Sequence, residues 1–277
     1  MIFAAIFLLL LMPSGIPIRA KAANNTAPTI LYVPGEVSTL QKAVNQISDG
    51  GIIELAAGTY TAPTGGWIFN DLEKGFTIRA ASGATVILSG SGKADILRVL
   101  NTDPSDGGPF IFQDLIFADG YSTTDGIAGG VTLQKAEATF INCAFQNNTG
   151  NQPSTGGGGT VVAVNSIAFF FNCTWTENSA KNYGGGLALE THSEAFVDNS
   201  LFSNNRTNFP NHSKTSAGGG IHVGNSTLRI SNTRFENNQA GYVGAGIYSI
   251  GSWSDTGSNI IVANCTFENN QSVQTTG

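Results

Sequence analysis

The sequence predicts an all-β protein folded as a right-handed parallel β-helix, a solenoid with three strands per coil and about eight coils. Composition is one reason, because 35 glycines with only 12% charged residues fit short strands with many tight corners. The other is a repeat, in which five aromatic residues follow one another at steps of 30, 27, 33 and 32 residues, each with Asn three positions later. These pairs are Phe145 and Asn148, Trp175 and Asn178, Phe202 and Asn205, Phe235 and Asn238, and Phe267 and Asn270.

The first segment, residues 1–23, is expected to be a signal peptide that is removed on export. Its apolar run ends at Met12, and Ala20 and Ala22 flank Lys21 in the small-x-small pattern of a cleavage site. The run is shorter than the ~20 residues needed to span a bilayer, so we expect no transmembrane span in the mature chain. A membrane anchor is the alternative interpretation.

Residues 24–50 are expected to hold an N-terminal strand and a capping helix. The run 38–41, Ser-Thr-Leu-Gln, matches a capping box, apolar residues follow at helical spacing, and Gly50 and Gly51 end the pattern. A short amphipathic helix at this point would cover the first coil and protect its open strand edges.

Residues 51–277 are expected to form the β-helix itself. Most repeats open with a glycine-rich segment such as 184–186 or 218–220, and three short segments with period-2 alternation follow it. Strands of successive coils then pair about 4.8 Å apart. The closing segment, CTFENNQSVQTTG, carries no capping pattern, so we expect the C-terminal coil to be covered by missing sequence or by a partner.

A polar residue three positions before each aromatic breaks the inward alternation and predicts a corner. Side-chain amides stacked in register can donate to and accept from one another along the axis, which predicts a ladder buried at this corner. A row of ligand-binding amides is the alternative. The predicted ladder consists of Asp114, Asn142, Asn172, Asn199, Asn232 and Asn264.

The segments GGGL and GGGI, together with FQNN, FSNN and FENN, resemble the repeats of chlamydial polymorphic outer membrane proteins over about residues 110–277. The opening STLQKAVNQISDGGIIELAAGTYT is similar to the start of many secreted pectin-lyase-like β-helices. Both resemblances imply a right-handed β-helix that is secreted or held at the cell surface. They imply much less about activity, since one scaffold hosts many functions.

The pectin-lyase-like resemblance also implies enzymes that use clustered carboxylates, a Ca²⁺ site or a basic residue on one strand face. The best acidic group here lies on two loops that could meet on adjacent coils and hold Ca²⁺. Solvated loop acids are the other interpretation, because turns are rich in Asp. The candidate carboxylates are Asp103, Asp106, Asp119 and Asp125.

His222 and Tyr248 occupy the same outward position in consecutive coils, and with Trp253 they form a candidate surface for a sugar or a protein partner. An aromatic surface pair without a ligand is the alternative. Cys143 and Cys173 take an inward position that requires a small residue, which predicts buried, unreactive thiols. A disulfide between them would strain its geometry.

The net charge of the chain restricts the classes of partner that it can bind. Residues 1–23 contain Arg19 and Lys21 but no acids, so the mature chain has 11 basic and 19 acidic residues and a net charge of −8. This charge argues against nucleic acid and anionic membranes as partners. We expect an adhesive, structural or partner-binding protein, without a cofactor, whose partner is an extracellular glycan or protein surface. The alternative is a polysaccharide lyase or glycoside hydrolase, and Ca²⁺ enters only there.

Overall fold

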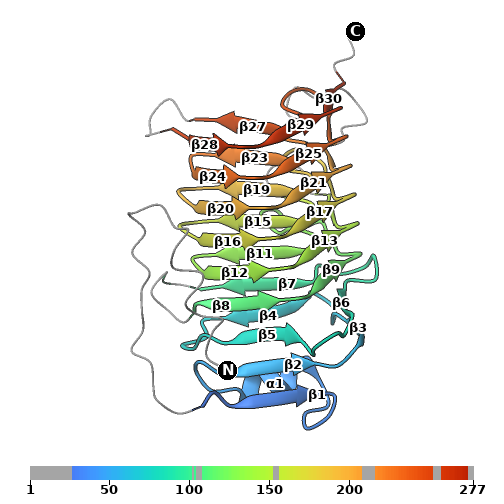
Figure 1. Ribbon diagram of the computed structural model, residues 1–277, viewed down its shortest axis with the longest axis vertical. Coiled ribbons are helices and arrows are strands. Elements are labelled where there is room, and N and C mark those ends of the chain that lie inside the picture. Colours follow the sequence, from blue (N-terminus) through green and yellow to red (C-terminus); the bar gives the residue numbers. More distant parts are fainter. Residues whose placement is uncertain are drawn as a thin grey trace.

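The structure is a computed structural model that describes residues 27–101, 103, 108–151, 156–207, 216–251 and 257–273. Their strands form four parallel sheets of nine, eight, seven and six strands, stacked along one long axis (Figure 1). Neighbouring strands in a sheet come from successive coils, so the chain returns to the same sheet once per coil. The predicted all-β parallel solenoid is confirmed.

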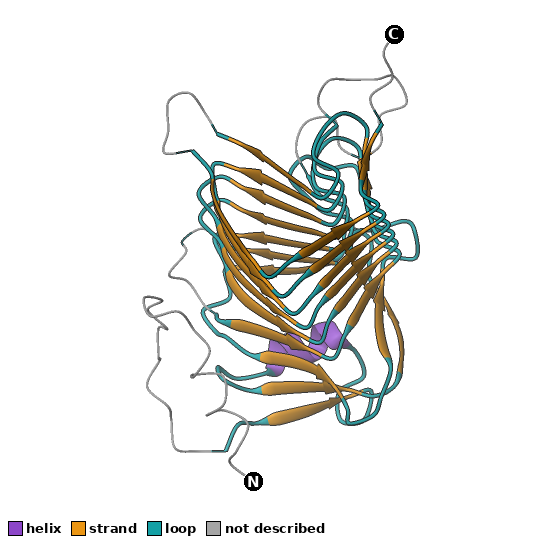
Figure 2. Cartoon of the chain, turned by 45° about the horizontal axis from the view of Figure 1, so that its top comes forward, coloured by secondary structure: helices purple, strands orange, loops and turns teal. Residues whose placement is uncertain are grey.

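Each sheet occupies one side of the coil, and the sheets surround a common interior (Figure 2). Sheet A consists of β1 (Ile30–Val33), β2 (Ile52–Leu55), β5 (Thr77–Ala80), β8 (Phe110–Gln113), β12 (Glu137–Ile141), β16 (Ile167–Phe171), β20 (Glu194–Asp198), β24 (Thr227–Ser231) and β28 (Asn259–Ala263). Sheet B consists of β3 (Gly58–Thr61), β6 (Val86–Ser89), β9 (Ile116–Ala118), β13 (Ala144–Gln146), β17 (Thr174–Thr176), β21 (Leu201–Ser203), β25 (Arg234–Glu236) and β29 (Thr266–Glu268). Sheet C consists of β4 (Trp67–Asn70), β7 (Leu97–Leu100), β11 (Val131–Gln134), β15 (Thr160–Ala163), β19 (Leu187–Glu190), β23 (Ile221–Gly224) and β27 (Ile247–Ile250).

Sheet D adds a fourth strand to the three predicted for each coil. Its members are two residues long, and from β14 on each directly follows the Asn that comes three positions after the aromatic. They are β10 (Tyr121–Ser122), β14 (Thr149–Gly150), β18 (Ser179–Ala180), β22 (Arg206–Thr207), β26 (Gln239–Ala240) and β30 (Gln271–Ser272). Among the described residues, sheet D begins only at β10, so the earlier coils have no strand in it.

The helix α1 (Leu40–Gln46) contacts β1 and β2 at the N-terminal end of the solenoid, as the capping prediction requires (Figure 1). Its N-cap is Thr39, not the first residue of the matched box, and the Thr39 hydroxyl accepts from the Lys42 N–H at 3.3 Å. Leu40, Ala43 and Val44 are buried against the first coils.

One aromatic ladder runs through the interior along sheet B. Its rings lie nearly parallel, with centroids 5.2, 5.1, 4.3, 4.9 and 4.6 Å apart from coil to coil. Parallel in-register pairing explains the spacing, since it places the same side-chain position of successive coils one above the other. The ladder consists of Phe117, Phe145, Trp175, Phe202, Phe235 and Phe267.

The glycine-rich segments pass directly against this ladder, which explains why they recur. A Cβ on Gly186 would lie 2.9 Å from Phe202 Cδ1 and 2.7 Å from the carbonyl oxygen of Gly220. Gly184, two positions earlier, has φ of 62°, a conformation that L side chains rarely adopt. The repeat therefore needs glycine once for a turn and once for close packing.

The predicted polar ladder forms a row at the corner between sheets A and B, but its side chains are exposed and not buried. Asn172 Nδ2 donates to Asn142 Oδ1 at 2.8 Å, and Asn142 Nδ2 donates to Asp114 Oδ1 at 2.8 Å. The row is interrupted, because Asn232 Nδ2 donates to Asp198 and not to Asn199. All six members have positive φ between 48° and 57°, a backbone conformation that Asn and Asp tolerate best after glycine.

The buried ladder is a different row, formed by the Asn that follows each aromatic by three positions. Asn178 Nδ2 donates to Asn205 Oδ1 at 2.9 Å and to the Phe145 carbonyl oxygen at 2.8 Å, and the neighbouring members repeat this pattern. Four members are fully buried. This row, and not the exposed one, satisfies the polar groups of a buried turn. It consists of Asn148, Asn178, Asn205, Asn238 and Asn270.

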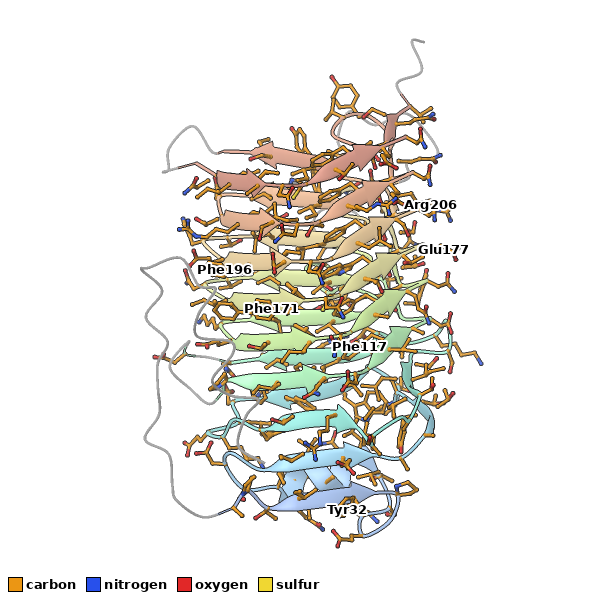
Figure 3. All side chains as sticks on the ribbon, viewed as in Figure 1. Tyr32, Phe117, Phe171, Glu177, Phe196 and Arg206 are labelled. Carbon is orange, nitrogen blue, oxygen red and sulfur yellow. The ribbon has the colours of Figure 1, made fainter. Side chains whose placement is uncertain are left out.

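Aromatic side chains also stand on the outer face of sheet A, where Figure 3 labels Phe171 and Phe196. Phe169 stacks on Phe196 with centroids 4.9 Å apart, and the Arg229 guanidinium lies 5.8 Å from the Phe196 centroid. The two rings face each other along the long axis of the solenoid. The pair therefore stabilises the stacking of neighbouring strands, and no ring face between the two side chains is open to a ligand.

The last described coil has several exposed apolar side chains. In contrast to the α1 end, no described helix lies over it (Figure 1). That a further segment or a partner covers this coil stays a prediction. The exposed residues are Ile250, Ile261, Val262, Phe267 and Val273.

Candidate functional site

The structure describes three of the four candidate carboxylates. Asp103 and Asp125 are exposed, Asp119 is half-buried, and Asp106 lies outside the described residues. Within the described part of the chain, no group of three or more His, Cys, Asp or Glu side chains is placed to hold a metal ion. Asp103, Asp119 and Asp125 are therefore not assembled as such a group.

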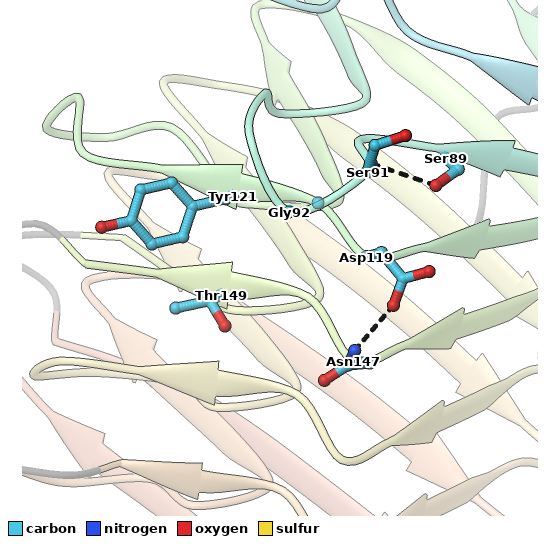
Figure 4. A pocket seen from close by; sticks show the side chains of 8 residues that line it. Ser89, Ser91, Gly92, Asp119, Tyr121, Asn147 and Thr149 are labelled. Carbon is cyan, nitrogen blue, oxygen red and sulfur yellow. Dashed lines mark hydrogen bonds between the residues drawn. The ribbon is translucent and has the colours of Figure 1, made fainter.

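Asp119 lines a polar groove of about 500 Å³ on the side of the solenoid (Figure 4). The groove lies between the end of β6 and the corners that lead into β10 and β14, where sheet D begins. Its lining offers hydroxyls, an amide, a carboxylate and one phenol ring. The lining residues are Ser89, Ser91, Gly92, Asp119, Gly120, Tyr121, Asn147 and Thr149.

Tight turns build the walls of this groove. Ser91 and Gly92 both have positive φ, and the Gly92 N–H donates to the Asp119 carbonyl at 2.7 Å. The Tyr121 N–H donates to the Ala94 carbonyl at 2.8 Å, which fixes the 90–94 loop against the first strand of sheet D. The backbone around the groove is thus hydrogen-bonded into the solenoid on both sides.

Hydrogen bonds also orient the groove side chains. Asp119 Oδ1 accepts from Asn147 Nδ2 at 2.6 Å, a short charge-assisted bond between adjacent coils (Figure 4). Tyr121 Oη accepts from Asn151 Nδ2 at 3.1 Å, and the Ser91 N–H donates to Ser89 Oγ at 3.0 Å. Sequence reasoning selected Asp119 but missed Tyr121 and Asn147. The available signal was the repeat itself, which places Asp119 and Asn147 at one position of successive coils.

The predicted aromatic surface is arranged differently from the expectation. His222 points outward from sheet C but is buried, with 3% exposure, because Tyr183 from the preceding coil covers it. The Tyr183 and His222 ring centroids are 4.4 Å apart, and those of His222 and Tyr248 are 5.7 Å apart. Trp253 lies outside the described residues.

Comparison with known proteins identifies the class of fold as a right-handed β-helix. The family model described as "Right handed beta helix region" matches residues 122–277, more than half of the sequence, so the chain belongs to this family. Comparison with the curated proteins gave no match. Among the described residues, no helix is long and apolar enough to cross a membrane.

Several solved structures are similar to this chain at low identity. Pectate lyase Pel9A is 14% identical, with 89% of this chain and 78% of that chain covered and a TM-score of 0.47. The PL6 family alginate lyase AlyGC is 16% identical, with 88% and 39% covered and a TM-score of 0.38. The pectin methylesterase from Aspergillus niger is 13% identical, with 90% and 88% covered and a TM-score of 0.40. Likenesses at this level say nothing about activity. The resemblance to chlamydial repeats stays a prediction.

Proposed function

We propose that this protein is a secreted or cell-surface adhesive β-helix that binds neutral glycans in the groove beside β10. The observation that carries the proposal is the convergence of the Asp119 carboxylate, the Asn147 amide, three hydroxyls and the Tyr121 ring on one open groove of about 500 Å³. Each of these groups matches a feature of a sugar. The extracellular location is part of the proposal.

Sugars present hydroxyls that both donate and accept, and a ring face of C–H groups. The Asp119 carboxylate accepts from hydroxyls, while the Asn147 amide and the Ser and Thr hydroxyls both donate and accept. The Tyr121 ring offers an amphipathic surface against which a sugar ring can pack. Because Asn147 and Asn151 already hold Asp119 and Tyr121, little side-chain freedom is lost on binding.

Charge favours a neutral glycan over a polyuronate. The whole chain carries a net charge of −6, and the groove contains a carboxylate but no Lys or Arg. A polymer of carboxylates would bring like charges together at Asp119. We therefore expect neutral oligosaccharides to bind and polygalacturonate to bind weakly or not at all.

The test is a glycan array followed by isothermal titration calorimetry with the best neutral oligosaccharide. Tyr121→Ala and Asp119→Asn should each lower the affinity at least about tenfold, the equivalent of one hydrogen bond to a charged group. Asp114→Asn is the matched control, since Asp114 has the same positive φ and also accepts from an Asn of the next coil, at 2.8 Å, but lies outside the groove.

Binding that is unchanged in Tyr121→Ala, or the absence of any neutral ligand on the array, would refute the proposal. The same samples should be assayed for polysaccharide depolymerisation with and without Ca²⁺. Release of reducing or unsaturated ends would support the lyase or hydrolase alternative.

We also propose that residues 1–23 are a signal peptide. If residues 1–23 are removed on export, mass spectrometry of the protein recovered from the medium will show an N-terminus near Asn24. A secreted protein that retains the apolar run up to Met12 would contradict this.

A further inference from the structure

A second cluster of polar and aromatic groups lies on the outer face of sheet C, on elements that do not line the groove. His222 on β23 and Tyr248 on β27 are paired in register, and Tyr183 precedes β19 (Figure 1). Tyr183 and Tyr248 are half-buried, whereas His222 beneath them is buried. Three successive coils thus bring three rings together at one place.

Glu190 places a carboxylate in the same cluster. It ends β19 and pairs in register with Gly224, and a Cβ on Gly224 would lie 2.6 Å from Glu190 Oε2. The glycine therefore makes room for the carboxylate to reach across to His222, where Glu190 Oε1 lies 2.8 Å from His222 Nδ1. The Glu190 side chain keeps 18% exposure while its Oε1 is buried, so a ligand would meet the carboxylate at Oε2.

The polar groups of this cluster are incompletely satisfied. Despite the 2.8 Å separation, His222 Nδ1 and Glu190 Oε1 are not aligned as a hydrogen bond, and His222 Nε2 has no hydrogen-bond partner among the described residues. An unsatisfied buried polar group is costly, and in native structures it calls for an explanation such as a ligand.

The electrostatic surroundings favour a cation. Burial raises the pKa of the Tyr183 phenol most, and nearby Tyr248 and Glu190 raise it further because they oppose a second negative charge beside them. Among the described residues, the cluster contains one carboxylate and no Lys or Arg in an ion pair with it. A cation would relieve the Glu190 charge and contact the electron-rich faces of the phenol rings.

We propose that Glu190, Tyr183 and Tyr248 bind an organic ammonium group, with His222 as the floor of the site. The ligand chemistry is organic and not metallic, because within the described part of the chain no His, Cys, Asp and Glu group is placed to hold a metal ion. Aromatic rings beside a carboxylate are the general recognition chemistry for quaternary and protonated amines. The proposal is independent of glycan binding in the groove.

The test is isothermal titration calorimetry of the full chain at constant ionic strength, with choline chloride in one arm, glucosamine hydrochloride in the other and sodium chloride as the blank. We expect heat of binding in at least one arm. Choline alone would identify a quaternary ammonium site, and glucosamine a site for protonated primary amines.

Glu190→Gln should lower the affinity at least about tenfold, while Asp114→Asn, which removes a carboxylate outside both the groove and this cluster, should leave it unchanged. Tyr183→Phe keeps the ring and should retain binding, whereas Tyr183→Leu should lose it. No binding above the sodium chloride blank, or equal affinity in Glu190→Gln and the parent protein, would overturn the proposal. Circular dichroism spectra matching the parent will show that each variant folds.

Discussion

Asn178 donates both its Nδ2 hydrogen and its backbone N–H to Asn205 Oδ1 inside the solenoid, at 2.9 and 3.1 Å. Asn205 in turn donates to the Trp175 carbonyl at 2.8 Å and to Asn238 Oδ1 at 3.0 Å. A single amide thereby satisfies polar groups in the coils on both sides of it. Neighbouring coils are coupled by hydrogen bonds as well as by ring stacking.

Replacing Asn205 with Ala should therefore destabilise the protein strongly. The substitution leaves the Asn178 amide and the Trp175 carbonyl buried without their partner, and each such group costs about 1–3 kcal/mol. We expect a loss of about 3–5 kcal/mol in the free energy of unfolding, measured by urea denaturation followed by circular dichroism.

Asn199→Gly is the matched control for the exposed row. Asn199 has φ of 48°, which glycine adopts without strain, and its side chain makes one long hydrogen bond of 3.4 Å. The expected change is within about 0.5 kcal/mol. If Asn199→Gly destabilised the protein as much as Asn205→Ala, the assignment of the stabilising ladder to the buried row would be wrong.

The difference between these two rows shows what sequence patterns can and cannot predict. The period of the aromatics predicted the solenoid, because in-register parallel pairing requires a constant repeat. Both Asn rows were visible in the sequence, but the side chains of the row before each aromatic face solvent and those of the row after it face the core, and spacing alone does not distinguish them. The groove also required the structure, since it depends on where sheet D begins. His222 was expected to be exposed because period-2 alternation gives the direction of a side chain but not what covers it.

Gly186→Ala should destabilise the aromatic ladder. The added methyl group would meet the Gly220 carbonyl oxygen at 2.7 Å and the Phe202 ring at 2.9 Å, and backbone atoms have little freedom to move. Overpacking of this kind typically costs about 1–3 kcal/mol. In Gly35→Ala the new methyl group would meet only Tyr32, at 3.4 Å or more, so its melting temperature should match that of the parent in differential scanning calorimetry, and that of Gly186→Ala should be lower.

Asp95→Asn tests a buried ion pair on the N-terminal part of sheet C. Asp95, only 5% exposed, accepts from Arg98 Nη2 at 2.6 Å and from Arg98 Nε at 2.7 Å. The amide removes the charge that compensates the guanidinium, so we expect a loss of about 2–3 kcal/mol in urea denaturation.

The half-buried pair of Arg229 and Glu194, 3.3 Å apart and with side chains 40% and 34% exposed, provides the comparison. Solvent reaches this pair and screens its charges, so Glu194→Gln should cost less than about 1 kcal/mol. Equal losses of unfolding free energy for Asp95→Asn and Glu194→Gln would mean that burial of the Asp95–Arg98 pair adds nothing to stability.

The three cysteines should differ sharply in reactivity. All are free, with Cys143 and Cys173 buried and Cys265 half-buried. Burial disfavours the thiolate, raising the pKa of Cys143 well above its usual value and that of Cys173 to about 12, so neither forms the reactive anion near neutral pH. In the native protein, iodoacetamide should modify Cys265 alone, with no increase at Cys143 or Cys173 between about pH 7 and pH 9, and all three in urea. Peptide mass spectrometry measures this directly, and rapid native labelling of Cys173 would show that the coil around it opens.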